Sequence, residues 1–458
     1  MGVALENSPT LFSNQYTEDV GKYRLYYNPT GHGEVVVVDQ QSQKLLELCD
    51  GAHSVDEIIM LDGRESRIVV EELNYLANSE VISISEMFSQ NLYRQTSNKR
   101  SKSFACWLHL TNTCNLACSY CYVHKSPGDM SVETGKLAID KMIQTCQNNN
   151  IHSMNVKVAG GEPLMRFSLI KELVDYSKKN CGDIKITYTL LTNGVLVTQE
   201  IAEFLRQNSI GIGVSLDGIG AVNDMCRHDR YGNGSYDSVI KGLKILREFE
   251  VQPSIMTTVS SINHSGLLEL TKYLLENKYY FRFSLEKDCD TGQPKILEDT
   301  DGVIKSLHSC YDYIEQNLPE KYITNIHKFG DVNFSRPAGS SCGAANNLIA
   351  IGHDRNLGVC GLGLSHPFST LDLSNDLLEG AVNFNSDLVN NVASDNLICC
   401  DCTWRKSCAG GCPLQTKSTY GRYDKPSPFC EIYKAILPRI LRIKAMQMIR
   451  NFESNYPC

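Results

Sequence analysis

The sequence predicts an α/β fold in which a partial, open barrel of parallel strands is flanked by two smaller domains. The first observation is that strand-like and helix-like segments alternate between residues 104 and 320, the pattern of a parallel sheet with helices outside it. The second is that residues 1–95 hold a single cysteine, Cys49, and carry strand and helix signals of their own. The third is that most other cysteines fall in two groups, one early in the alternating region and one between residues 342 and 430.

Length, charge and cysteine usage limit the classes of protein to consider. A chain of 458 residues is too long for one ordinary domain. Its net charge of −8 gives no reason to expect a nucleic acid or an anionic membrane as a partner, and no apolar run is long enough to predict a membrane span. The N-terminus lacks a basic stretch followed by an apolar one, so no secretory signal is predicted. Nineteen cysteines without such a signal indicate a cytoplasmic protein that uses cysteine for metal rather than for disulfides.

Residues 1–95 are predicted to form a small domain of strands and helices. Ser54, followed three residues later by Glu57, is a capping-box start of a helix. The other elements expected are strands over 23–29 and 34–39, helices over 42–48 and 69–78, and a short strand over 81–84.

Residues 104–320 are predicted to form six strand–helix units. Six units are too few for a closed eight-stranded barrel, so the pattern favours a partial (β/α)₆ barrel. The predicted strands cover residues 106–112, 155–159, 185–192, 210–216, 252–259 and 280–285. The predicted helices cover residues 132–147, 167–179, 199–208, 236–250, 265–277 and 303–317.

Cys114, Cys118 and Cys121 follow the first predicted strand and lie on one loop. In an iron–sulfur cluster held by cysteine thiolates, three cysteines leave one iron of a four-iron cube without a protein ligand. A structural zinc site uses four protein ligands and a catalytic one usually includes histidine, so zinc fits this spacing less well. Three buried structural cysteines are the remaining alternative. We therefore expect a cluster with an open iron at which chemistry can take place.

The spacing C-x₃-C-x-aromatic-C, with Tyr120 as the aromatic residue, resembles the signature of the radical S-adenosylmethionine (radical SAM) superfamily. The resemblance implies a partial (β/α)₆ TIM-like barrel over residues 104–320 and a [4Fe-4S] cluster whose open iron binds S-adenosylmethionine. It also implies cleavage of that cofactor to a 5′-deoxyadenosyl radical, with an external reductant such as flavodoxin or ferredoxin as a partner.

In such a barrel the chemistry lies on the loops at the carboxyl ends of the strands. The glycine pair after the second strand permits close backbone approach, and the carboxylate of Glu162 can take the ammonium group of the cofactor. Short polar groups after the fourth strand suit ribose hydroxyls, and Arg227 can pair with the carboxylate of the cofactor. The resemblance thus assigns cofactor binding to Tyr120, Gly160, Gly161, Glu162, Asn193, Ser215, Asp217 and Arg227.

The elements expected in residues 1–95, with the run from Leu45 to Gly51, resemble the winged-helix peptide recognition element of ribosomal-peptide maturation systems. The resemblance implies a precursor peptide as a partner, whose leader segment adds a strand to the sheet edge and packs on the third helix. An inert cap and a DNA-binding winged helix are the alternatives. Glu71 and Glu72 make the third helix acidic, which is unlike a helix that reads DNA.

The second group of cysteines, in residues 335–458, contains the spacing C-x₂-C-x₅-C-x₃-C and resembles the SPASM extension of peptide-modifying radical enzymes. The resemblance implies two auxiliary [4Fe-4S] clusters in this domain, and therefore three clusters in the chain. It assigns Cys399, Cys402, Cys408 and Cys430 to an outer cluster, and Cys342, Cys360 and Cys412 to an inner one.

The inner set has only three members, so its fourth position is empty, filled by a side chain such as Cys400, or filled by substrate. A zinc ribbon is the alternative for the C-x₂-C-x₅-C-x₃-C spacing, but it leaves three of the other cysteines without a role. The chain also departs from the family pattern at two positions. Arg355 stands where the family often has glycine, and Gly361 stands where sulfatase-maturing relatives have an Asp that serves as a base.

These resemblances imply an enzyme that cross-links a ribosomally synthesised precursor peptide by removing hydrogen from an unactivated side-chain carbon. We expect a carbon–carbon ring (a cyclophane) in preference to a thioether. Glu286, Asp288 and Asp290, just past the sixth strand, are candidate acids or bases, although residues in such places often only cap a helix. A formylglycine-forming enzyme of the sulfatase-maturase type, disfavoured by Gly361, and a non-catalytic iron–sulfur carrier of peptides are the alternatives.

Overall fold

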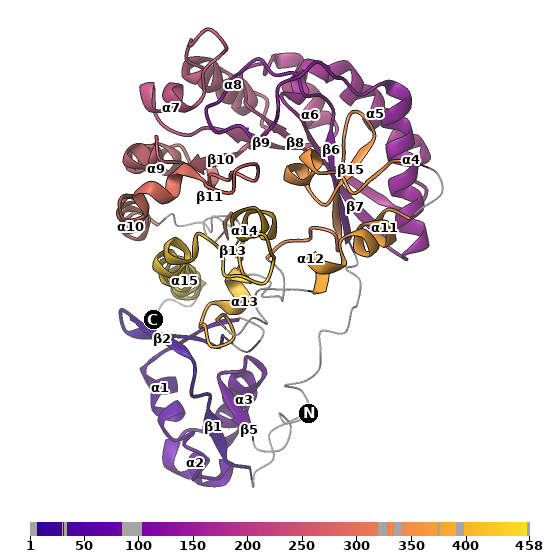
Figure 1. Ribbon diagram of the computed structural model, residues 1–458. Coiled ribbons are helices and arrows are strands. Elements are labelled where there is room, and N and C mark those ends of the chain that lie inside the picture. Colours follow the sequence, from indigo (N-terminus) through magenta and orange to yellow (C-terminus); the bar gives the residue numbers. More distant parts are fainter. Residues whose placement is uncertain are drawn as a thin grey trace.

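The structure, a computed structural model, describes residues 7–29, 31, 34–84, 103–318, 328–330, 332–333, 341–372, 376–390 and 398–455. Its parts are stacked: the elements of residues 9–84 lie at one end, the barrel at the other, and the C-terminal segment between them (Figure 1). Among the described residues, no helix is both long and apolar enough to cross a membrane.

The centre of the fold is a sheet of parallel strands that forms a partial barrel. Six strands, β6 to β11, follow one another in chain order, and each pair of neighbours is parallel. They are β6 (Ser103–His109), β7 (Ser153–Ala159), β8 (Lys185–Thr192), β9 (Gly211–Ser215), β10 (Ser254–Val259) and β11 (Tyr280–Leu285). Because parallel neighbours need a crossover connection, a helix follows each strand.

The crossover helices are α4 (Val132–Asn148), α5 (Phe167–Asn180), α6 (Gln199–Gln207), α8 (Tyr236–Glu248), α9 (Leu267–Glu276) and α10 (Thr300–Gln316). All six predicted units are therefore confirmed. The short helix α7 (Ala221–Cys226), between β9 and α8, was not predicted. Its end carries Arg227 into the site described below.

Alternation along the strands separates the apolar core from the barrel interior. In β7, Met154, Val156 and Val158 are buried in the main core, whereas Lys157 lines an internal cavity. Successive side chains of a strand point to opposite faces, so one face packs under the helices and the other is free to carry polar groups.

The C-terminal segment extends this sheet at both edges. β14 (Leu348–Ile351) pairs in parallel with β6, and β15 (Asn356–Gly358) and β16 (Ser369–Thr370) continue from it. At the opposite edge β12 (Lys328–Phe329) pairs with β11, and β13 (Val332–Asn333) pairs with β12. These short strands cover backbone groups that an open barrel would leave unpaired.

Residues 9–84 form a unit with its own apolar core. Its elements are the sheet β2 (Tyr16–Val20), β3 (Tyr23–Tyr27) and β4 (Val35–Val38), the helices α1 (Gln40–Glu47), α2 (Val55–Asp62) and α3 (Ser66–Asn78), and the pair β1 (Pro9–Leu11) and β5 (Ile82–Ile84). The predicted helices and strands are confirmed, including the capping box of Ser54 and Glu57. The returning strand β5 pairs with β1, which was not predicted, and not with the β2–β3–β4 sheet.

The long helix α15 (Cys430–Asn455) joins the N-terminal unit to the barrel. Arg442 on this helix contacts both Glu18 of β2, at 2.8 Å, and Glu315 of α10, at 3.1 Å. Nearby, the ring of Tyr27 stacks on Trp404 at a centroid distance of 5.8 Å. Contacts of this kind place the N-terminal sheet against the C-terminal segment, as Figure 1 shows.

Candidate functional site

A cavity of about 430 Å³ opens at the carboxyl ends of the barrel strands. Its wall includes the three cysteines of the first group together with Gly160, Gly161, Asn193, Ser215 and Arg227. The structure thus brings together residues from the loops after four different strands, as the sequence predicts. Of the eight predicted cofactor-binding residues, Glu162 and Asp217 do not line the cavity.

The loop that carries Cys114, Cys118 and Cys121 is fastened to the segment around α7. The backbone N–H of Ala117 donates to the carbonyl of His228 at 2.7 Å, and that of Ser119 donates to the carbonyl of Cys226 at 3.0 Å. Burial raises the pKa of the Cys118 thiol to about 11, and the neighbouring Arg227 opposes this shift. Cations near a thiol favour the thiolate form that binds metal.

The glycine pair after β7 lets two backbone segments meet. Gly160 has a φ of +155°, and the N–H of Gly161 donates to the carbonyl of Thr111 at 2.6 Å. A Cβ on Gly161 would lie 2.3 Å from the carbonyl oxygen of Thr113, a distance that side-chain atoms do not tolerate. Glycine is therefore required here so that the second loop can pack against the residues directly before Cys114.

Glu162 is fully buried, and both of its carboxylate oxygens accept hydrogen bonds from the chain itself. The donors are the N–H of Leu164 at 3.0 Å, the hydroxyl of Thr192 at 2.7 Å and the N–H of Asn193 at 2.8 Å. Burial raises the pKa of this carboxyl, and the three hydrogen bonds oppose the increase. In this arrangement Glu162 positions Asn193, whose side chain faces Asn115 at 2.8 Å on the cysteine loop.

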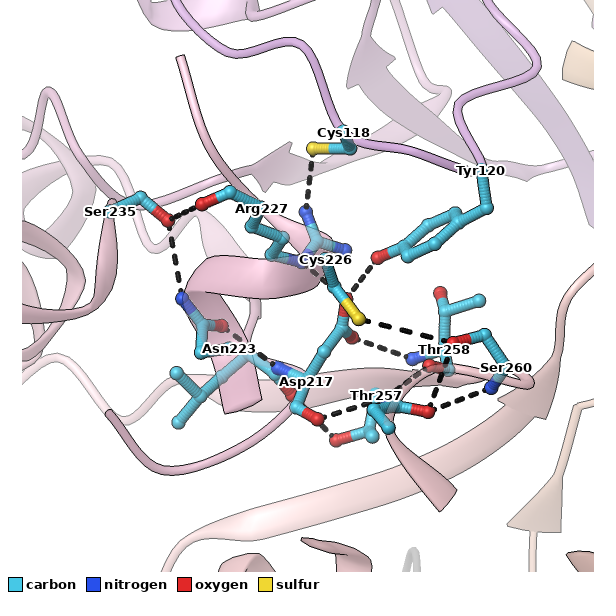
Figure 2. A network of polar contacts seen from close by, with 12 residues as sticks. Cys118, Tyr120, Asp217, Asn223, Cys226, Arg227, Ser235, Thr257, Thr258 and Ser260 are labelled. Atoms are coloured by element: carbon cyan, nitrogen blue, oxygen red, sulfur yellow. Dashed lines mark hydrogen bonds and ion pairs between the residues drawn. The ribbon is translucent and has the colours of Figure 1, made fainter. Parts of the chain in front are cut away.

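A buried ion pair between Asp217, just after β9, and Arg227, just after α7, contacts the cysteine loop (Figure 2). The Nε of Arg227 lies 2.6 Å from the carboxylate of Asp217, which also accepts the N–H of Thr258 at 2.9 Å. The hydroxyl of Tyr120 donates to the same carboxylate. A second guanidinium nitrogen of Arg227 lies 3.8 Å from the sulfur of Cys118. Asp217 therefore holds the two residues that face the cavity, Tyr120 and Arg227, rather than reaching the cavity itself.

The cavity wall is strongly cationic. It contains Lys125, Lys157, Arg227, Arg282 and Lys287, and no Asp or Glu among the residues that the structure describes. Burial lowers the pKa of Lys157, and the charge of Arg282 lowers it further. Only Arg227 was predicted. Strand alternation places Lys157 and Arg282 inside the barrel once the register is known, whereas Lys125 and Lys287 lie on loops.

The three candidate acids and bases after β11 lie outside the cavity wall. Asp288 accepts the N–H groups of Asp290 and Thr291, at 3.1 and 2.8 Å, and so fixes a turn. Asp290 lies 3.3 Å from His124 at the surface. Glu286 is 9% exposed, and burial raises its pKa, but its carboxylate does not face the cavity.

The second group of cysteines separates into two places. Cys399, Cys402, Cys408 and Cys430 all line one small cavity between α13 (Arg405–Cys408) and α15. Within the described chain, no three cysteine, histidine or acidic side chains approach closely enough to hold a single metal ion. Four thiols around one small cavity are the arrangement that the predicted outer cluster requires.

The two departures from the family pattern have visible structural settings. Arg355 has a φ of +71°, the left-handed conformation for which glycine is suited. Gly361 lies on the cavity wall against Trp107, and a Cβ there would be 2.7 Å from the indole ring.

Comparisons with known proteins agree with this geometry. Residues 108–274 match the sequence profile of the Radical SAM superfamily. An uncharacterized protein of Methanocaldococcus jannaschii is 37% identical over 169 residues, 37% of this chain and 57% of that protein. The radical SAM cyclopropyl synthase TigE of Paramaledivibacter caminithermalis is 26% identical over 270 residues, 53% of this chain and 56% of that protein. The chain thus spans little more than half the length of these two relatives.

Two further matches cover more of the chain. A cysteine-type anaerobic sulfatase-maturating enzyme of Clostridium novyi is 20% identical over 347 residues, 72% of this chain and 92% of that protein. The crystal structure of Streptococcus suis SuiB bound to the precursor peptide SuiA superposes with a TM-score of 0.53 and 19% identity, over 92% of this chain and all of that one. At this identity the likeness concerns the fold.

Proposed function

We propose, from the premise that this chain is a radical SAM enzyme, that it installs an intramolecular cross-link in a ribosomally synthesised precursor peptide. The observation that carries the proposal is the cavity that unites Cys114, Cys118 and Cys121 with six of the eight predicted cofactor-contacting residues at the carboxyl ends of the barrel strands. One relative, TigE, is named a radical SAM cyclopropyl synthase, and SuiB was solved bound to the precursor peptide SuiA; both support the choice of substrate class.

The residues of the cavity fit a four-iron cluster and S-adenosylmethionine. Three half-buried thiols converge on the cavity and leave room beside them. When bound, the cluster and S-adenosylmethionine would supply, with one electron from a flavodoxin or ferredoxin, a 5′-deoxyadenosyl radical that removes one hydrogen atom from a side-chain carbon. Closure of the ring would release a proton and pass the second electron to the inner auxiliary cluster that the C-terminal cysteines would hold. Gly160 and Gly161 expose backbone to the cofactor, Ser215 suits a ribose hydroxyl, and Arg227 suits a carboxylate.

The remaining cations of the wall bind and orient the substrate. Lys157 and Arg282 come from β7 and β11 and face the interior of the barrel. A peptide carboxylate complements the positive charge of this wall, which has no acidic residue among those that the structure describes.

The N-terminal unit is proposed as the recognition element for the leader segment of the precursor. A leader that adds a strand to a sheet edge gains backbone hydrogen bonds and places its side chains in neighbouring pockets. Large apolar side chains are exposed on its helices: Met60 and Leu61 on α2, and Ile68 and Tyr75 on α3. Ile68 and Tyr75 are seven residues apart and share a face of α3, so they offer an apolar strip to a docked segment.

Carbon–carbon ring closure is favoured over the alternatives. The named product of the TigE relative is a cyclopropyl group, an all-carbon ring. The sulfatase-maturating reaction is a second candidate because of the match to the Clostridium novyi enzyme. Against it stands Gly361, which packs on Trp107 and leaves no space for a basic carboxylate at that position.

The test is co-expression of the chain with the short open reading frames that neighbour its gene, followed by mass spectrometry of each peptide. Carbon–carbon closure predicts a product lighter by two hydrogen atoms that persists when every Cys of the precursor is replaced by Ser. A product that requires a precursor Cys indicates a thioether or formylglycine instead. No product from any peptide, with 5′-deoxyadenosine still formed, would argue against a peptide substrate. Cys118→Ala is the matched inactive control.

A further inference from the structure

Lys157 lies inside the barrel, deeper than the loops of the cluster site. It belongs to β7, two residues before Ala159 at the end of that strand, and it lines the main cavity. Two residues of a strand span about 7 Å, so the backbone of Lys157 lies that far below the end of its strand. Gly160 and Arg227, which are expected to contact the cofactor, lie on loops instead. Lys157 is therefore at a different level of the barrel from these two residues.

The layer beneath Lys157 is polar but is hydrogen-bonded within the chain. Asn155 points to the same side of β7 as Lys157, because alternate residues of a strand share a face. Its side-chain amide donates to the hydroxyls of Thr187 and Thr189 on β8, at 3.0 and 3.2 Å. None of these three side chains lines the cavity. The polar group that β7 presents to a ligand at this depth is therefore the ammonium group of Lys157.

A second cation reaches the same cavity from the opposite wall of the barrel. Arg282 lies on β11, four places from β7 in the sheet, in register with Met256 of β10. One of its guanidinium nitrogens lies 3.6 Å from the sulfur of Met256. Met256 in turn packs over Gly213, where a Cβ would be 2.9 Å from the methionine methyl group. Glycine on β9 thus gives room to Met256, beside which the guanidinium of Arg282 lines the cavity.

A carboxylate of the substrate fits these cations better than a group of the protein or of the cofactor does. No Asp or Glu lines the cavity within the described part of the chain. Lys157, which is half-buried, makes no hydrogen bond or ion pair with the residues that the structure describes. A partly buried ammonium group costs free energy unless another group accepts its hydrogen bonds. The carboxylate of S-adenosylmethionine is expected beside Arg227, on the loops, and so leaves Lys157 to the substrate.

We propose that Lys157, with Arg282 on the opposite wall, binds an Asp or Glu side chain of the precursor peptide. The proposal rests on the proposed function, because it names the class of peptide that the reaction takes: precursors with an acidic residue at or beside the modified position. A carboxylate held at this depth fixes which peptide carbon lies near the loops that hold the cofactor. Lys157 is then a specificity-determining residue.

The first test is a scan of the precursor that co-expression identifies. Each Asp or Glu of the modified segment is replaced in turn by Asn or Gln, and the full chain, reconstituted anaerobically, is assayed with each peptide. We expect one such replacement to lower kcat/KM about tenfold or more, because it removes a charge pair inside the cavity. The proposal is overturned if every amide peptide reacts like the original. It is also overturned if only residues added after the C-terminus impair the reaction, since the terminal carboxylate is then the bound group.

An exchange of charges tests whether Lys157 is the partner. Lys157→Glu should lower kcat/KM for the original precursor, and a precursor with Lys in place of the sensitive acidic residue should recover it. Lys244→Glu, at an exposed position of α8, is the matched control and should resemble the wild type. A lysine that only stabilises the barrel or balances the charge of a cluster gives no such recovery.

Lys157→Gln covers the case in which Lys157→Glu does not fold. This variant should lose activity with the original precursor, but it should lose no more with the amide peptide, because the charge pair is already absent. Losses that add for enzyme and peptide would overturn the proposal.

A further measurement needs no precursor. Reductive methylation of the anaerobic full chain, mapped by mass spectrometry, reports access to the Nζ of Lys157. N-acetylglutamic acid α-amide should slow methylation of Lys157 and not of Lys244, whereas N-acetylglutamine amide should slow neither. Equal methylation of Lys157 with the two probes would overturn the proposal. A chain that forms 5′-deoxyadenosine and modifies no peptide counts only against the proposed function, and the two probes then decide whether Lys157 binds an acidic side chain.

Discussion

The side chains that hold the cysteine loop are mostly not those that face the cavity. Asp217 is fully buried and binds Arg227, Tyr120 and the backbone of Thr258. Glu162 similarly binds backbone and hydroxyl donors of the next loop. The sequence places both residues in the correct loops, but it does not show whether a carboxylate faces a ligand or a neighbouring loop. That choice depends on side-chain packing between strands far apart in the chain.

Replacing Asp217 by Asn tests this positioning role. The change leaves the buried guanidinium of Arg227 without its charged partner, so we expect the free energy of unfolding to fall by about 3–5 kcal/mol. Urea unfolding of the anaerobic protein measures it. Glu200→Gln, which removes a surface ion pair with Lys171, is the control and should cost no more than about 1 kcal/mol. Equal losses in the two variants would contradict the account.

Gly361→Ala tests the contact with Trp107. The added Cβ meets the indole ring, and overpacking of this kind costs about 1–3 kcal/mol of stability. Thermal unfolding measures the loss. In a Trp107→Leu background the same change should cost much less, because the two residues are coupled. Additive effects of the two substitutions would show that the side chains do not meet.

At the scale of elements, the six barrel units could be predicted because each carries its own periodicity and sits between clear turns. The strands β12 to β16 could not, since they are short and form by pairing with barrel edges distant in the chain. The same limit applies to the turn after β11. Its place beside α14 (Pro413–Tyr420) depends on Gln415 and Ser418, which are far from it in sequence.

His109, the last residue of β6, should make the stability of the protein depend on pH. Burial lowers the pKa of this histidine from 6.5 to about 4, and the charge of His353 acts in the same direction, while the hydrogen bond to Asn112 opposes it. The pKa of His109 is lower in the folded state than in the unfolded chain. Above pH 6.5 the histidine is neutral in both states and does not change the free energy of unfolding. As the pH drops from 6.5 towards 4, only the unfolded chain takes up the proton, so the free energy of unfolding falls. The loss amounts to at most about 3 kcal/mol.

The difference between the wild type and His109→Gln isolates this effect. Glutamine cannot be protonated in this range, so its unfolding free energy should fall less steeply between pH 6.5 and 4. Urea unfolding across this pH range gives both curves. Parallel curves for the two proteins would mean that His109 is not the titrating group.

At the scale of the molecule, two sets of contacts hold the parts together. One set joins the loops at the carboxyl ends of the barrel strands, and the other is made by the C-terminal segment, which joins the barrel to the N-terminal unit. The cysteine spacing predicts the first site and the outer group, and the members of each set line a common cavity. The spacing could not predict the cationic barrel interior or the role of α15 in joining β2 to α10. Both depend on how the parts are assembled.

Tyr75→Glu tests whether the N-terminal unit binds the leader segment while the barrel carries out cleavage of S-adenosylmethionine. A charge on the exposed apolar strip of α3 should weaken docking of a leader, so we expect KM for the precursor to rise about tenfold or more. Formation of 5′-deoxyadenosine in the absence of peptide should be unchanged. Arg67→Ala, at another exposed position of α3, is the control. An unchanged KM for Tyr75→Glu would remove this strip from the binding surface.

The central claim is that Cys114, Cys118 and Cys121 hold a cluster with an iron open to S-adenosylmethionine. The most direct measurement is the yield of 5′-deoxyadenosine from anaerobically reconstituted protein, S-adenosylmethionine and dithionite, together with the iron content. We predict about twelve irons per chain and steady formation of 5′-deoxyadenosine, which Cys118→Ala abolishes while the auxiliary clusters remain. Protein that contains zinc in place of iron, or that binds iron and forms no 5′-deoxyadenosine, would contradict the account.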